Sequence, residues 1–134
     1  MAKGAVDSLG DEVQLLSPFP VTPESIIKYY NSADVFILTS FDEGSPNAVK
    51  EAMACNLPIV STAVGDVEWL LQDIEGAYIG GFSSQHFSEQ LKKAVDYSTT
   101  HVYSSGRQKL LDLRLSSHQV ADNILRVYEK ALSC

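Results

Sequence analysis

The feature that most constrains the fold of this chain is a pair of short apolar runs separated by a polar turn and a helix. Residues 33–40 and 59–62 form the two runs, and each is short enough to be a strand. Their apolar residues are continuous rather than alternating, which is typical of strands buried on both faces of a parallel sheet. Between the runs, Glu43 and Glu51 stand eight positions apart across a small-residue loop and a helix start. This order predicts polar groups beyond the carboxyl ends of strands, where open α/β sheets bind ligands.

The same kind of apolar run occurs four times and predicts four strands, at residues 13–16, 35–39, 59–62 and 77–79. Helical patterns fill the intervals, so we expect right-handed crossovers and a parallel sheet. Helix starts are predicted where a capping residue precedes a proline or an apolar helix face. These starts are at Thr22-Pro23, Ser45-Pro46, Asp66, and Ser83 or Ser84.

The C-terminal tail has a different pattern, with two helical segments at 106–115 and 117–132 and no strand between them. Apolar residues at helical spacing in the second segment are expected to face the sheet or a partner. They are Val120, Ala121, Ile124, Val127, Tyr128 and Leu132. The chain is therefore expected to be an α/β protein with a Rossmann-like parallel sheet of about four strands, helices on both faces and a helical C-terminal tail. Residues 1–134 are expected to form one domain, with strand-helix repeats at about 12–98 and the tail at about 103–132.

Composition limits the classes of function that are open to the chain. Its 134 residues are 45% hydrophobic and 20% charged, which suits one soluble globular domain with a core. The net charge of −7 and the scattered basic residues argue against a nucleic-acid partner, because phosphate contacts need lysine and arginine. No apolar run approaches the roughly 20 residues of a membrane helix, and the N-terminus lacks a signal-peptide core. Cys55 and Cys134 have no metal-type spacing, so we expect reduced thiols and a cytoplasmic location.

The run from Asp34 to Gly65 closely resembles the donor-binding half of group 1 (family 4) glycosyltransferases of the GT-B fold. The signature of that family is a glutamate, seven residues, and a second glutamate that opens an Ala-Met-Ala helix. Glu43 and Glu51 match it, and Glu51-Ala52-Met53-Ala54 follows the pattern. The resemblance implies an enzyme that moves a sugar from a nucleotide diphosphate donor to an acceptor hydroxyl. It further implies retention of anomeric configuration and no metal or other cofactor.

The family roles carry over to the two glutamates. Glu43 is the predicted catalytic residue, a carboxylate that hydrogen-bonds hydroxyls of the donor sugar. Glu51 is predicted to hold the ribose hydroxyls, on the helix face that it shares with Asn47. Other interpretations remain open, since Glu43 could be a solvated loop acid or a helix cap, and Glu51 could be an exposed acid paired with Lys50 or another neighbour. Lys50 itself is expected to point away as a surface residue.

Two loops complete the predicted donor site. Gly44 permits close backbone approach, Ser45 is the expected N-cap, and the amides of Asn47 and Ala48 are expected to face the diphosphate or the sugar. Many relatives have an aromatic residue and a glycine in place of Ser45 and Pro46. The resemblance also places a base site at the turn after the first predicted strand, at Ser17 and Phe19. The alternative for that turn is a rigid loop with a packed phenylalanine.

Weaker candidates lie at the same edge of the sheet: Ser40, Thr62, Gly65 and Glu68. His86, His101 and His118 are expected to be surface residues, and no His, Cys or Asp spacing indicates a metal.

Relative to the resembled lobe, the chain is expected to be a fragment. It lacks the Gly-Arg pair and the lysine that contact the donor diphosphate, and also the N-terminal acceptor-binding lobe. It is therefore expected to be inactive alone and to form a homodimer. The complete enzyme is expected to associate peripherally with a membrane. The Glu-Gly-Ser-Pro-Asn variant looks most like enzymes of bacterial surface-polysaccharide assembly.

Two other function classes are the alternatives. A flavodoxin-like signalling receiver needs carboxylates at the carboxyl ends of its strands, whereas Asp34 lies at the amino end of its strand. A sugar-nucleotide epimerase would share the two-glutamate helix but is usually much longer there.

Overall fold

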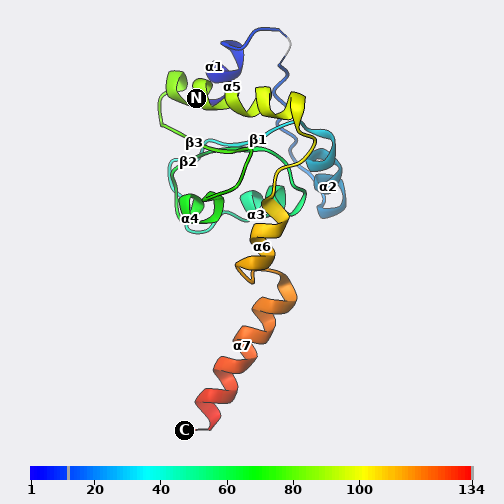
Figure 1. Ribbon diagram of the computed structural model, residues 1–134, viewed down its shortest axis with the longest axis vertical. Coiled ribbons are helices and arrows are strands. Elements are labelled where there is room, and N and C mark those ends of the chain that lie inside the picture. Colours follow the sequence, from blue (N-terminus) through cyan, green and yellow to red (C-terminus); the bar gives the residue numbers. More distant parts are fainter. Residues whose placement is uncertain (12, 134) are drawn as a thin grey trace.

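The computed structural model describes residues 1–11 and 13–133. Its centre is a parallel sheet in the order β1 (Phe36–Leu38), β2 (Ile59–Thr62) and β3 (Ala77–Gly80). Phe36 pairs with Ile59, and Ile59 pairs with Ala77. Helices α2 (Pro23–Ser32), α3 (Asn47–Ala54) and α4 (Val67–Leu71) lie on one face of the sheet, and α1 (Ala2–Asp7) and α5 (Ser84–Thr100) lie on the other (Figure 1).

The core has two parts, one on each face of the sheet. The first joins β2 to α3 and α4, with Met53 and Leu70 fully buried. The second joins β2 to α5 and α1 around Phe87, which is also fully buried. Neighbouring residues of β2 serve opposite faces, since Ile59 belongs to the first part and Val60 to the second. This burial on both sides explains why the strand sequence is continuously apolar.

The α/β class and the parallel sheet with helices on both faces are confirmed, and three of the four expected strands form. The run at residues 13–16 is not a strand in the structure. Leu15 and Leu16 are 38% and 57% exposed, so this run is not buried against β1. The backbone hydrogen bond found there is local, from Val13 N to Gly10 O at 3.4 Å, rather than a rung of a ladder. Helix α1 was not expected from the sequence.

Two of the expected helix caps form and two do not. Thr22 caps α2 in a reciprocal capping box with Ser25, and Ser83 caps α5 by accepting from His86 N. Ser45 is not the N-cap of α3, because Pro46 occupies that position and the Ser45 hydroxyl bonds elsewhere. Asp66 is the N-cap residue of α4 but makes no side-chain capping bond.

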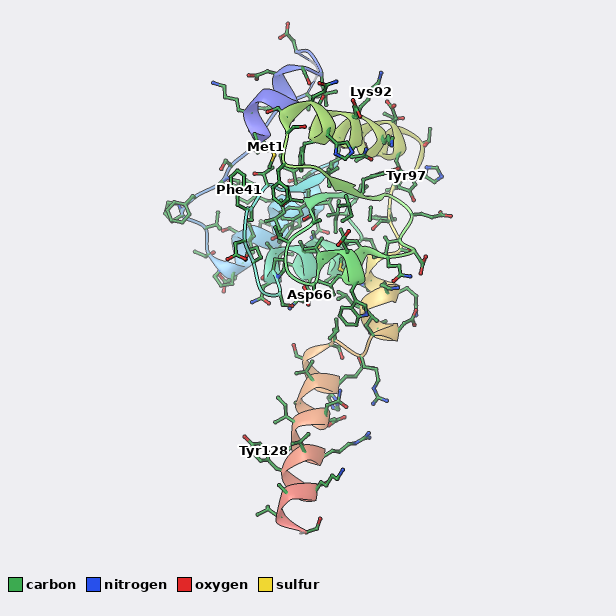
Figure 2. The ribbon with its side chains drawn as sticks, turned by 90° about the vertical axis from the view of Figure 1, so that its left-hand side faces the viewer. Met1, Phe41, Asp66, Lys92, Tyr97 and Tyr128 are labelled. Carbon is green, nitrogen blue, oxygen red and sulfur yellow. The ribbon has the colours of Figure 1, made fainter. Side chains whose placement is uncertain are left out.

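The tail forms α6 (Gly106–Asp112) and α7 (Ser117–Leu132). Helix α6 ends earlier than expected because Arg114 adopts a left-handed conformation, with φ 58°, and turns the chain. Helix α7 has the expected bounds but projects away from the sheet (Figure 1) and has no buried residue. The expectation that its apolar residues could face the sheet is therefore wrong. Tyr128 lies far from the body of the domain (Figure 2).

Candidate functional site

Glu43 lies in the loop between β1 and α3, at the carboxyl end of the sheet. It is half-buried, and its Oε1 accepts a hydrogen bond of 2.8 Å from the Ser40 hydroxyl. The Ser40 carbonyl in turn accepts from Thr62 Oγ1 at 2.7 Å, which ties the end of β1 to the end of β2. Among the described residues, Oε2 of Glu43 has no hydrogen-bond partner. The carboxylate is therefore held on one side and open on the other.

The loop that contains Glu43 is braced by residues 65 and 66. Gly65 has φ +54°, and a Cβ at this position would overlap the Gly44 carbonyl oxygen. Asp66 N donates to Gly44 O at 3.1 Å, and the Ser45 hydroxyl donates to Asp66 Oδ2 at 2.5 Å. The other carboxylate oxygen, Asp66 Oδ1, is buried without a hydrogen-bond partner among the described residues. Figure 2 shows Asp66 on the side of the domain that faces away from α5. This brace fixes the path of the backbone beside Glu43.

The first turn of α3 presents backbone amides without a side-chain cap. Pro46, its buried N-cap residue, has no N–H, and no side chain caps this helix. The amides of Asn47 and Ala48 therefore belong to the set that a helix leaves without intrahelical acceptors. Those amides carry the positive end of the helix dipole, which favours an anion.

Glu51 lies one turn further along α3, with an exposed side chain. Its Oε2 accepts a 3.0 Å hydrogen bond from the hydroxyl of Tyr30 on α2, and the same hydroxyl lies 3.5 Å from Ala48 O. Burial raises the pKa of the Tyr30 phenol above its usual range, and the hydrogen bond to Glu51 and its charge raise it further. The hydroxyl is thus a protonated donor at neutral pH. Among the described residues, no ion pair joins Glu51 to Lys50.

The outer face of α3 lines a groove of about 490 Å³ with α6 and the start of α7. Asn47 and Glu51 lie on its wall, as do Lys50 and Arg107. Lys50 does not point away as expected, because its Nζ donates to Asn47 Oδ1 at 3.4 Å. Arg107 Nε donates to Ala54 O at 2.7 Å. Two cations therefore flank the Glu51 side of the site.

The predicted base site at Ser17 and Phe19 is not hydrogen-bonded to the rest of the candidate site among the described residues. Ser17 and Phe19 are exposed, and Phe19 is exposed by 92%, so the alternative of a packed phenylalanine is wrong. No hydrogen bond between described residues joins this segment to α3. His86, His101 and His118 are exposed, as expected. Glu68 on α4 and Asp34, which precedes β1, are also exposed.

Three of these contacts could not be predicted from the sequence. The Tyr30–Glu51 and Ser45–Asp66 hydrogen bonds each join residues 21 positions apart, so they depend on how α2, α3 and α4 pack. The brace at Gly65 was visible only as a glycine that follows a strand.

Together, the parallel sheet, the loop acid at its carboxyl edge and the open helix start define an α/β domain with a candidate ligand site at the carboxyl edge of its sheet. The family model described as "Glycosyl transferases group 1" matches residues 2–97. The chain belongs to this family.

Two curated relatives illustrate the similarity. A D-inositol 3-phosphate glycosyltransferase of Paenarthrobacter aurescens is 27% identical over 113 residues, covering 76% of this chain and 28% of that protein. The N,N'-diacetylbacillosaminyl-diphospho-undecaprenol alpha-1,3-N-acetylgalactosaminyltransferase of Campylobacter jejuni is 25% identical over 111 residues, covering 80% of this chain and 29% of that protein. The matched part of this chain thus spans less than a third of each relative.

A solved structure supports the fold. Sucrose-phosphate synthase from Thermosynechococcus elongatus superposes with a TM-score of 0.78 at 20% identity, over 98% of this chain and 34% of that one. Within the described part of the chain, no helix has the length and apolar character needed to cross a bilayer.

Proposed function

We propose that this chain forms the donor-binding part of a retaining glycosyltransferase that uses a nucleotide diphosphate sugar. The observation that carries the proposal is the placement of Glu43 and Glu51 around the open start of α3, in a chain of the group 1 family. A donor of this kind offers sugar hydroxyls, a diphosphate and a ribose diol in one line. The site offers a carboxylate, free amides and a second carboxylate in the same order along the chain.

Each group of the site has a proposed role. Glu43, held by Ser40, accepts hydrogen bonds from sugar hydroxyls through its open oxygen. The amides of Asn47 and Ala48 face the diphosphate, aided by the helix dipole. Gly44 allows the donor to approach the loop backbone closely, and Glu51 holds the ribose.

The Ser45 hydroxyl acts through the loop rather than on the donor, because it is bonded to Asp66. Ser17 and Phe19 contribute to the base end of the site, where the exposed Phe19 ring offers a face for stacking. No metal is part of this proposal.

This chain alone is proposed to bind a donor without turning it over. Departure of the diphosphate needs electrostatic stabilisation that typically contributes several kcal/mol. Among the described residues, the cations that line the site are Lys50 and Arg107, which flank Glu51 rather than Glu43. The substrates are proposed to belong to bacterial surface-polysaccharide assembly, the class of enzymes that the Glu-Gly-Ser-Pro-Asn sequence at residues 43–47 resembles.

We propose a second copy of this chain as the partner of α7. The helix exposes Ile124, Val127 and Tyr128 by 49%, 67% and 64%. Asp122 lies in its first half and Lys130 in its last turn. An antiparallel pair of α7 helices would bury both apolar stripes and bring Asp122 of each copy near Lys130 of the other.

Glu51→Ala tests the ribose assignment. Loss of a charge-assisted hydrogen bond should weaken binding of a nucleotide diphosphate by on the order of 1.5–3 kcal/mol, measured by calorimetry. Glu89→Ala, which removes an exposed acid on α5 on the opposite face of the sheet, is the matched control and should bind like the parent. An unchanged dissociation constant for Glu51→Ala with an intact fold would sink the assignment.

Glu43→Gln separates the sugar from the nucleotide. The variant should bind the sugar nucleotide more weakly by about 1 kcal/mol or more, and bare nucleoside diphosphate like the parent. Calorimetry with both ligands makes the comparison. Equal losses for the two ligands would refute a role specific to the sugar.

A further inference from the structure

We propose that Tyr30 is a positioning residue for the donor, which acts by fixing the carboxylate of Glu51. This inference rests on the proposed role of Glu51 in binding ribose. It concerns a residue on α2, outside the loop and helix that carry the two glutamates.

The main polar interaction of the Tyr30 side chain is its hydrogen bond to Glu51. Its ring is 8% exposed and packs edge-to-face on Phe36, with centroids 5.7 Å apart. Its hydroxyl reaches out of this apolar setting and donates to Glu51 Oε2 at 3.0 Å. The second acceptor, Ala48 O, is more distant at 3.5 Å. The tyrosine ring is rigid and has only two side-chain torsions, so it holds the hydroxyl oxygen in place.

Glu51 needs such support because it is exposed and flexible. A glutamate side chain has three rotatable bonds, and ordering it on binding costs free energy. The Tyr30 hydroxyl restrains one carboxylate oxygen in advance. Oε1 has no hydrogen-bond partner among the described residues, so it stays available for a ligand hydroxyl.

The hydrogen bond also has the correct direction for this role. Tyr30 stays protonated at neutral pH, as its raised pKa requires, so it donates and Glu51 accepts. A carboxylate that accepts from Tyr30 at one oxygen can still accept from a diol at the other.

The test compares Tyr30→Phe with Tyr29→Phe, since both remove one hydroxyl and keep the ring. Tyr29 is 41% exposed and makes no side-chain hydrogen bond to a described residue. Calorimetry with uridine, guanosine and adenosine diphosphates identifies the nucleotide that the parent binds. Tyr30→Phe should weaken binding of that nucleotide about fivefold, which corresponds to one hydrogen bond, and Tyr29→Phe should leave it unchanged.

A double-mutant cycle separates positioning from a loss of stability. In the Glu51→Ala background, Tyr30→Phe should cause no further loss of affinity. Val49→Ala, which truncates a buried residue on the other face of α3, should lower the urea midpoint without weakening binding. Without ligand, Tyr30→Phe should shift the carbon-13 resonance of the Glu51 carboxylate, and Tyr29→Phe should not.

The possible failures are distinguishable. If Glu51→Ala loses affinity while Tyr30→Phe does not, the inference about Tyr30 is wrong and the proposed function survives. If the parent binds no nucleotide, or Glu51→Ala binds as the parent does, the proposed function fails and this inference falls with it. The positioning role would also be overturned if Tyr30→Phe weakened binding by the same factor in the Glu51→Ala background as in the parent.

Discussion

The region around α3 and the helix α7 have similar amphipathic sequences but opposite environments. Helix α3 buries Val49, Ala52 and Met53 completely against the sheet and α6. Helix α7 is twice as long and buries no residue, although apolar side chains recur along it. Helical periodicity therefore predicts the element in both cases but not what covers its apolar face. Packing stabilises α3, whereas α7 has only local hydrogen bonds and helix propensity, which leave an isolated helix of this length marginal.

The largest expected contrast is between core truncations in the two helices. Met53→Ala should lower the free energy of unfolding by about 2–5 kcal/mol, because it leaves a cavity in the core that joins β2 to α3 and α4. Ile124→Ala on α7 should change it by less than about 1 kcal/mol, because the side chain is already 49% exposed. Urea unfolding of both variants, at a protein concentration where the chain is monomeric, measures the difference. Similar losses would show that α7 is packed as firmly as α3.

A second contrast lies within the loop that precedes α3. Gly65→Ala should cost about 2–4 kcal/mol, because it combines left-handed backbone strain with a clash against Gly44 O. Gly44→Ala is the control, since no atom lies within 4 Å of the added methyl group. It should cost below about 1 kcal/mol. The same urea experiment measures the free energy of unfolding of both variants. Equal losses would mean that the backbone around Gly65 can shift to accommodate a methyl group at little cost.

The smallest expected effect concerns the partner of α7. Under reducing conditions the chain should approach a dimer mass in light scattering as its concentration rises. Tyr128→Glu should keep it monomeric, because a charge would enter the paired apolar stripe. Glu89→Gln on the exposed side of α5 is the control and should associate like the parent. A clean monomer at high concentration would show that a second copy is not what covers α7.

The elements that the sequence predicted are those set by local patterns. Continuous apolar runs identified β1, β2 and β3, and a capping residue followed by proline identified the start of α2. Helix α1 was missed because it is six residues long, has no side-chain cap and shows no clear period. The predicted strand at 13–16 failed because an apolar run becomes a strand only where a neighbour can pair with it.

The two glutamates of the candidate site could be predicted from the sequence, but the hydrogen bonds that orient them could not. The resemblance supplied Glu43 and Glu51, and the structure places both beside the start of α3, which leaves their roles as predictions. The bonds that orient them come from Ser40, three positions away, and from Tyr30, on another helix. Ser45 illustrates the limit, because a local rule makes it a cap while the fold offers its hydroxyl a stronger, carboxylate partner at Asp66.

The most direct test of the account is a nitrogen-15 NMR titration of the intact chain with uridine, guanosine and adenosine diphosphate sugars. The account predicts saturable amide shifts for at least one of them at Gly44, Asn47 and Ala48, with smaller changes at Glu51. It also predicts that amides of α7 distant from the groove, such as those of Val127 and Tyr128, do not respond. Shifts confined to other parts of the chain, or no saturable shift with any of the three ligands, would contradict it.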